Sequence, residues 1–158
     1  MMKLNWSVPA AALLLAACVA ADRNDIGPAP AQAMAPADIV AARQAAFHMS
    51  AVTSGSLKNA VTSGADLKSQ AFAARGLARW ANALPTMFPP STASVPSRAR
   101  PEIWTSRAEF DRIAAEFASH AGALPQLAQA GGRAQFAARL EAAQATCSAC
   151  HDRFRADP

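Results

Sequence analysis

Four stretches of the chain repeat apolar residues every three or four positions, which is the spacing of an amphipathic helix. The most regular stretch follows Gly131 and Gly132 and runs to residue 154. Its apolar residues are separated by 4, 3, 4, 3 and 4 positions: Phe136, Leu140, Ala143, Cys147, Cys150 and Phe154. Such a heptad-like seam is typical of a helix in a left-handed bundle. We therefore expect both cysteines on this seam to face the bundle interior.

The first predicted helix begins near Pro36, because proline is favoured in the first turn of a helix, and Asp38 adds an acidic residue there. One face of this helix follows the helical repeat: Val40, Arg43, Phe47, Ser50, Ser54, Leu57 and Val61. The two serines make this face only weakly apolar at its middle, where Gly55 also lowers the helix propensity. Residues 62–64 then break the helix.

The second predicted helix spans residues 66–84, and Pro85 ends it because proline has no N–H for the helical hydrogen bond. Its bulky residues are compatible with two different buried faces: Phe72, Leu77, Trp80 and Leu84. Prolines then recur along residues 85–101, which we predict to be a loop with Met87 and Phe88 as its apolar anchors. A loop of this length in a small bundle often carries function.

The third predicted helix opens after residues 100–104, and Ser106 and Glu109 have the spacing of a capping box. Its apolar residues keep helical spacing until Gly122 and Pro125, where we expect the helix to be interrupted. Four helices joined mostly by short connections predict an all-α protein, an antiparallel four-helix bundle.

The composition agrees with this fold and limits the classes of binding partner. The chain has 158 residues, which favours a single domain because domains commonly contain roughly 100–200 residues. It is 52% hydrophobic, rich in alanine and free of tyrosine, as expected of close-packed helices rather than of sheets. The net charge of +4 is not gathered into a basic stripe, so we expect no nucleic-acid partner.

The N-terminus has the features of an export signal. Lys3 precedes an apolar run, residues 8–17, that is too short to span a bilayer. Residues 15–18 resemble a bacterial lipobox, so we expect residues 1–17 to be a lipoprotein signal peptide and Cys18 to be lipidated. Ordinary cleavage near residue 21 is the alternative. Residues 18–36 have the composition of a flexible tether, which leaves residues 37–158 for the bundle.

The motif that carries chemistry lies near the end of the chain, at residues 147–151. Cys147, Cys150 and His151 form the C-x-x-C-H pattern of covalent c-type haem attachment. Positions i, i+3 and i+4 of a helix share one face, so all three side chains can reach the same porphyrin. A disulfide would have to close within one helical turn, a thioredoxin-like motif usually opens a helix, and zinc would need further ligands such as His48 or His120. The pattern therefore favours haem.

The place of the motif in the chain narrows the class of cytochrome. Only residues 152–158 follow it and none is methionine, so the second axial position of the iron is filled from an earlier helix or left open. In this respect the chain resembles class II c-type cytochromes, and most closely the cytochrome c′ family. The resemblance covers about residues 36–155 and rests on four local matches: residues 43–47, 84–85, 99–104 and 147–155.

This resemblance implies a fold and a cofactor. A cytochrome c′ is an antiparallel four-helix bundle with one haem c covalently attached near the C-terminus. By their match to the family motif, Cys147 and Cys150 would form the thioether bonds and His151 would bind the iron. The protein would lie in the periplasm, which agrees with the export signal because haem is attached to such motifs on the exported side in bacteria.

The resemblance also implies residues around the haem. Arg43 and Gln44 match residues along one haem edge, and Arg100 and Glu102 match residues that contact the haem from another side. Arg155 matches an arginine that borders the proximal pocket. Arginine suits the haem propionates because it pairs with carboxylates through two parallel hydrogen bonds.

Phe47 matches the position that faces the open side of the iron in the family. A phenyl ring has no lone pair to donate, so the resemblance implies five-coordinate, high-spin iron that binds NO or CO. The alternative is a low-spin electron carrier of the cytochrome c-556 type, in which Met49 or His48 would bind the iron. A helical rotation of about 100° per residue turns both side chains away from the direction of Phe47.

The expected function is therefore binding of small diatomic gases, with one-electron transfer as a second capacity. No acid–base pair or second cofactor motif accompanies the haem motif, so we do not expect an enzyme. The sequence leaves the redox partner unidentified and homodimerisation open. A four-helix protein without haem is the remaining alternative.

Overall fold

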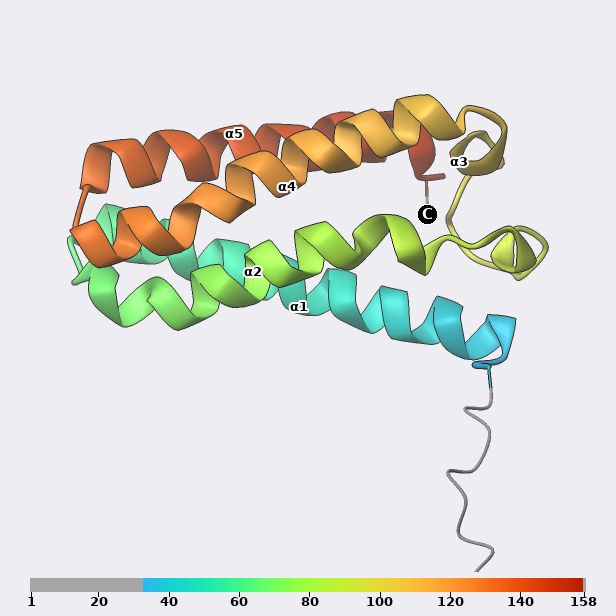
Figure 1. Ribbon diagram of the computed structural model, residues 1–158, viewed down its shortest axis with the longest axis horizontal. Coiled ribbons are helices and arrows are strands. Elements are labelled where there is room, and N and C mark those ends of the chain that lie inside the picture. Colours follow the sequence, from blue (N-terminus) through green and yellow to red (C-terminus); the bar gives the residue numbers. More distant parts are fainter. Residues whose placement is uncertain (1–32, 158) are drawn as a thin grey trace, which may run out of the picture. The chain divides into compact units, whose positions relative to one another are not determined.

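The computed structural model describes residues 33–157, which form an all-α bundle. Its four long helices are α1 (Pro36–Ser63), α2 (Ala71–Ala83), α4 (Arg107–Ala130) and α5 (Arg133–Phe154), and consecutive long helices run in opposite directions (Figure 1). Within these residues no strand forms, and none of the helices is long and apolar enough to cross a bilayer. The predicted fold class is confirmed. The predicted signal peptide, Cys18 and most of the tether lie outside the described residues.

Two of the long helices are followed by a glycine in the left-handed backbone conformation. Gly64 follows α1 with φ 76° and Gly131 follows α4 with φ 70°, a conformation that only glycine adopts without strain. Near these turns Arg133, at the start of α5, donates hydrogen bonds to carbonyl oxygens that end the first helix or follow it: Ala60 at 3.1 Å, Val61 at 3.2 Å and Ala65 at 2.6 Å. This arginine therefore ties the first helix to the last.

The predicted interruption of the third helix at Gly122 and Pro125 is wrong. Helix α4 continues through both residues to Ala130. Pro125 removes one backbone hydrogen bond, but Leu124 and Ala128 beside it are fully buried. Burial of this last segment compensates for the missing bond.

The predicted capping box is also wrong. Ser106 is the residue before α4, but its side chain makes no capping hydrogen bond. A short helix, α3 (Glu102–Thr105), precedes Ser106, whose backbone N–H bonds instead to the carbonyl oxygen of Glu102 at 2.8 Å. Ser106 has φ −116° and ψ 45°, which is not the extended conformation of a usual N-cap residue, so its hydroxyl does not cap α4.

The segment between α2 and α3 is a loop, as predicted, with two short 3-10 turns, Leu84–Met87 and Pro90–Thr92. A third 3-10 turn, Leu67–Gln70, leads into α2. Arg107 of α4 holds the loop by donating to the carbonyl oxygens of Phe88 at 2.9 Å and Pro85 at 3.0 Å. The loop is thus fixed against the bundle rather than extended into solvent.

The two ends of the bundle differ in packing. At the end with the glycine turns, which we call the closed end, the core side chains are almost fully buried: Leu57, Leu67, Leu124 and Phe136. At the opposite end, which we call the cavity end, several large inward residues are only half-buried: Phe47, Trp80, Cys147, Cys150 and His151. The structure also shows which face of the second helix is inward: Leu77 is buried, whereas Phe72 is 81% exposed.

Candidate functional site

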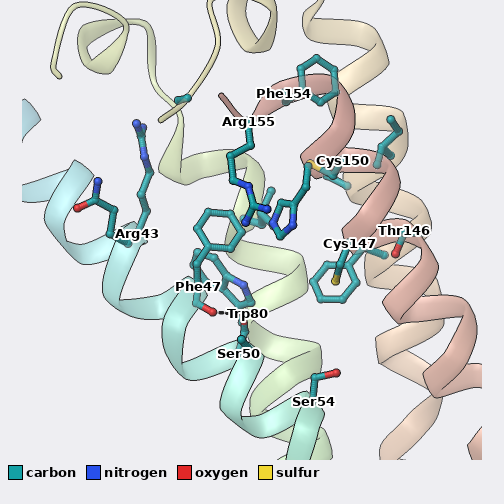
Figure 2. A pocket seen from close by; sticks show the side chains of 18 of the residues that line it. Arg43, Phe47, Ser50, Ser54, Trp80, Thr146, Cys147, Cys150, Phe154 and Arg155 are labelled. Atoms are coloured by element: carbon teal, nitrogen blue, oxygen red, sulfur yellow. Dashed lines mark hydrogen bonds between the residues drawn. The ribbon is translucent and has the colours of Figure 1, made fainter. Parts of the chain in front are cut away.

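A cavity of about 740 Å³ lies among the helices at the cavity end. This volume falls within the range of cofactor pockets, about 300–1,000 Å³. All four long helices, the loop and α3 contribute to its wall, which is mostly apolar and carries many rings: Phe47, Trp80, Phe88, Phe110, Phe117 and Phe154. Figure 2 shows several of these side chains around the space between α1 and α5.

Cys147 and Cys150 line this cavity from α5, as the heptad seam predicts. Both are free thiols, so the alternative of a disulfide between them is absent from the structure. Burial raises the pKa of Cys147, and burial together with the neighbouring Cys147 raises the pKa of Cys150 to about 11. The two thiols are therefore protonated at neutral pH. Within residues 33–157 no group of three potential metal ligands gathers, which disfavours zinc.

His151 follows on the same helix face and also lines the cavity. Burial lowers the pKa of this imidazole most; the positive charges of Arg155 and Arg98 lower it further, and Asp152 opposes them. The ring is therefore neutral at pH 7, which is the form that binds metal ions.

The Phe47 ring lies opposite His151, with the two ring centroids 6.5 Å apart. It makes edge contacts with Trp80 at 5.1 Å and with Phe88 at 6.3 Å. The alternative axial ligands lie elsewhere. Met49 is 61% exposed and does not line the cavity, whereas His48 is exposed but stands at the cavity edge.

Arg43 is buried at 2% exposure beside the cavity, a rare state for an arginine. Its guanidinium donates to Thr92 Oγ1 and Ser97 Oγ, each at 3.1 Å, and stacks on the Phe88 ring at 4.3 Å. Burial lowers its pKa, yet a guanidinium stays protonated in proteins. Among residues 33–157 no carboxylate forms an ion pair with it. The cavity therefore has a buried positive charge at its edge without a counter-ion.

The other residues implied by the resemblance are not all brought to the cavity. Gln44 lines it from an exposed position, and Arg155 lines it as well. Arg100 and Glu102 do not line it. Arg100 points back to the carbonyl oxygen of Asp152 at 3.5 Å, and Oε2 of Glu102 is buried with no hydrogen-bond partner among the described residues.

Arg98 and Trp80 are lining residues to which the sequence pattern had assigned no role at the site. An isolated antiparallel bridge between Ala99 and Arg155 brings Arg98 beside the end of α5. Such pairing between a loop and a chain end leaves no periodic signal in the sequence. For Trp80 the sequence gives a partial indication. It is one of the bulky residues of the second predicted helix, which are compatible with two different buried faces.

These features fit a flat, covalently attached macrocycle. Two protonated thiols and a neutral imidazole face an apolar space of sufficient volume from a single helix. The Phe47 ring borders the same space, with its centroid 6.5 Å from that of the His151 ring and the two planes inclined by 64°. A four-helix bundle with such a site near its C-terminus defines a class II c-type cytochrome.

Comparison with known proteins identifies the family. The family model described as Cytochrome C' matches residues 38–155, so the chain belongs to the cytochrome c′ family. A cytochrome c' from Rhodospirillum rubrum is 33% identical over 85 residues, which are 53% of this chain and 58% of that relative. The chain thus spans somewhat more than half the length of this curated relative. As a member of the family the protein carries covalent haem c, and Cys147 and Cys150 near the C-terminus are the cysteines available for its attachment.

Solved structures agree on the fold. The cytochrome c' from Rubrivivax gelatinosus superimposes with a TM-score of 0.73 at 27% identity, covering 79% of this chain and 100% of that one. The nitric oxide complex of a mutant cytochrome c prime from Alcaligenes xylosoxidans gives a TM-score of 0.73 at 28% identity, covering 80% of this chain and 100% of that one.

Proposed function

We propose that this protein is a periplasmic cytochrome c′ whose haem iron has His151 as its single axial protein ligand and binds NO or CO on the side of Phe47. The observation that carries the proposal is the position of Phe47, a side chain without a lone pair, which lines the cavity with its ring centroid 6.5 Å from that of His151. When bound in this cavity, haem supplies an iron atom that can take a diatomic ligand and exchange one electron.

The residues around the cavity have distinct parts in holding the haem. Cys147 and Cys150 attach it, and the buried cation of Arg43 has the charge and the planar donor geometry to meet a propionate. Gln44 and Arg155 border the same space from α1 and α5. Arg100 and Glu102, which the resemblance implies as haem contacts, do not line the cavity in this structure.

Gas binding is the main activity in this proposal, with a role in trapping NO or tolerating it. A mutant of the cytochrome c prime from Alcaligenes xylosoxidans was solved as a nitric oxide complex, which supports a diatomic ligand for this chain. One-electron exchange with an unidentified redox partner is the second capacity. The protein acts by binding and by electron exchange rather than as an enzyme.

The spin state of the ferric protein tests this proposal most directly. We expect the purified protein to show a high-spin signal by electron paramagnetic resonance and a high-spin absorption spectrum, and to bind CO after reduction. A low-spin ferric spectrum would favour the electron carrier of the c-556 type instead. In that case His48→Ala and Met49→Ala, made separately, would show which of the two side chains is the second ligand.

Export and assembly form a separate part of the proposal. The expected signal peptide of residues 1–17 places the protein in the periplasm, anchored to the membrane if Cys18 is lipidated. Intact mass of the purified protein distinguishes a lipidated Cys18 from cleavage near residue 21. Light scattering during size-exclusion chromatography measures whether the protein forms a homodimer.

A further inference from the structure

Trp80 of α2 has no part in the proposed function, although it lines the cavity and touches Phe47. We propose that Trp80 is a positioning residue that holds the Phe47 ring opposite His151 and so limits how fast a diatomic ligand binds. This inference rests on the proposed function, because it concerns the side of the site where the gas ligand enters.

The contact between the two rings has the geometry of a specific aromatic pair. Their centroids are 5.1 Å apart and their planes are inclined by 85°, so the edge of one ring meets the face of the other. This arrangement is preferred over a face-to-face stack because the positive edge of one ring meets the negative face of the other. Of the ring contacts that Phe47 makes, this one is the shortest.

The neighbour on another side of Phe47 is held in place. Phe88 is 4% exposed and lies 6.3 Å from Phe47. The Arg43 guanidinium stacks on Phe88, and Phe110 packs against it at 5.0 Å. Because this cluster is closely packed, Phe47 cannot move toward it without displacing buried side chains.

The cavity wall near Phe47 along α1 is formed by small residues. Ser50, Ala51 and Ser54 line the cavity there, and Figure 2 shows Ser50 and Ser54 on the turns that follow Phe47. A Cβ atom added to Gly55 would meet nothing within 4 Å. Phe47 itself is only half-buried, so neither these small residues nor the Phe88 cluster encloses its ring on every side. Trp80 is therefore the neighbour that holds the ring opposite His151.

The experiment measures CO association with the reduced holoprotein after laser photolysis. Replacing Trp80 with leucine removes the ring that meets Phe47, so we expect the association rate constant of Trp80→Leu to rise roughly three- to tenfold, the factor that an aromatic pair of this kind is worth. Trp80→Phe keeps a ring at this position and should restore most of the wild-type rate. If Trp80→Leu does not load haem, Trp80→Met replaces it and keeps more of the volume.

The control and the double variant separate positioning from general loosening. Trp104→Leu removes another half-buried tryptophan, which packs on Phe88 at 6.3 Å but does not line the cavity. We expect this variant to change the rate by less than about twofold. In a Phe47→Ala background, Trp80→Leu should add less than about twofold, since the ring it positions is gone.

A second readout does not depend on gas binding. In the ligand-free holoprotein, the guanidinium midpoints of Phe47→Ala, Trp80→Leu and the double variant should be non-additive, because the two rings form one contact. An unchanged CO rate in Trp80→Leu, or a full effect in the Phe47→Ala background, would overturn the inference. A six-coordinate wild-type protein would overturn the proposed function instead, while the non-additivity would still report whether Trp80 and Phe47 act as a pair.

Discussion

The closed end and the cavity end are built from the same four helices, but they satisfy different requirements. At the closed end Leu57, Leu124 and Phe136 are 0% exposed and fill the space between helices. At the cavity end, by contrast, Cys147 and Cys150 occupy the same seam of α5 and are only half-buried, because they face the cavity. One heptad pattern thus supplies packing in its first half and cofactor attachment in its second half.

The difference between the ends shows where stability and function can be changed separately. α4 packs extensively against both α2 and α5, whereas α1 makes fewer contacts with its neighbours. The looser helix is the one that presents Arg43 and Phe47 to the cavity. We therefore expect changes at the closed end to act on unfolding and changes at the cavity end to act mainly on the haem.

The largest expected effect is the loss of the cofactor. Replacing both Cys147 and Cys150 with serine removes the two thiols available for attachment, so the protein should carry no covalent haem. A haem stain after denaturing electrophoresis checks this, with Ser148→Ala, an exposed residue inside the motif, as the control. A stain that survives in the double variant would show that attachment occurs elsewhere.

The next largest effect is a loss of folding stability caused by a change at the closed end. Phe136→Ala should lower the free energy of unfolding by about 3–5 kcal/mol, the usual cost of deleting a buried phenyl ring. The ferric spectrum in the absence of denaturant should not change, since this residue does not line the cavity. Denaturant unfolding measures the loss, and Phe72→Ala, at an 81% exposed position, should change stability by less than about 0.5 kcal/mol. A shifted spectrum in Phe136→Ala would mean that the two ends are coupled.

A smaller loss is expected for Arg133→Leu, which removes the hydrogen bonds between α5 and the end of α1. Hydrogen bonds from a charged donor are worth about 1.5–3 kcal/mol when buried, and Arg133 is half-buried, so we expect a loss of roughly 1–2 kcal/mol. Arg112→Leu is the matched control, because Arg112 pairs with Glu116 on the exposed surface of α4 and should contribute less than about 1 kcal/mol. Equal unfolding midpoints for the two variants would show that Arg133 does not tie the helices.

The smallest effect on stability, with a large effect on the haem, is expected for Phe47→Met. A thioether opposite His151 offers a lone pair, so the ferric iron should move toward a six-coordinate, low-spin state. Volume-conserving apolar changes usually cost less than about 1.5 kcal/mol. Paramagnetic resonance and absorption spectra measure the change, with Phe47→Leu as a variant that should remain high spin. No spectral change would place a different residue over the iron.

Much of the fold could be predicted because its signals are local. Pro36 and Gly64 correctly predicted where α1 begins and ends. The apolar seam of α5 was also predicted correctly throughout its length. The interruption predicted at Pro125 was wrong because the sequence shows the lost backbone hydrogen bond, which is local. The compensating burial of Leu124 and Ala128 depends on packing against other helices. Ser106 misled for a similar reason, since the short α3 before it changes the direction of the chain.

The sequence by itself determined the attachment site. Cys147, Cys150 and His151 lie within five consecutive residues, so any helix presents them together, and their chemistry does not depend on distant contacts. The resemblance also implied that Phe47 faces this site, but only the tertiary structure decided which side chains hold Phe47 and Arg43 in place. The contact of Phe47 with Trp80 and the burial of Arg43 under the loop depend on how α1, α2 and the loop pack together. These contacts join residues dozens of positions apart, and no local spacing in the chain records them.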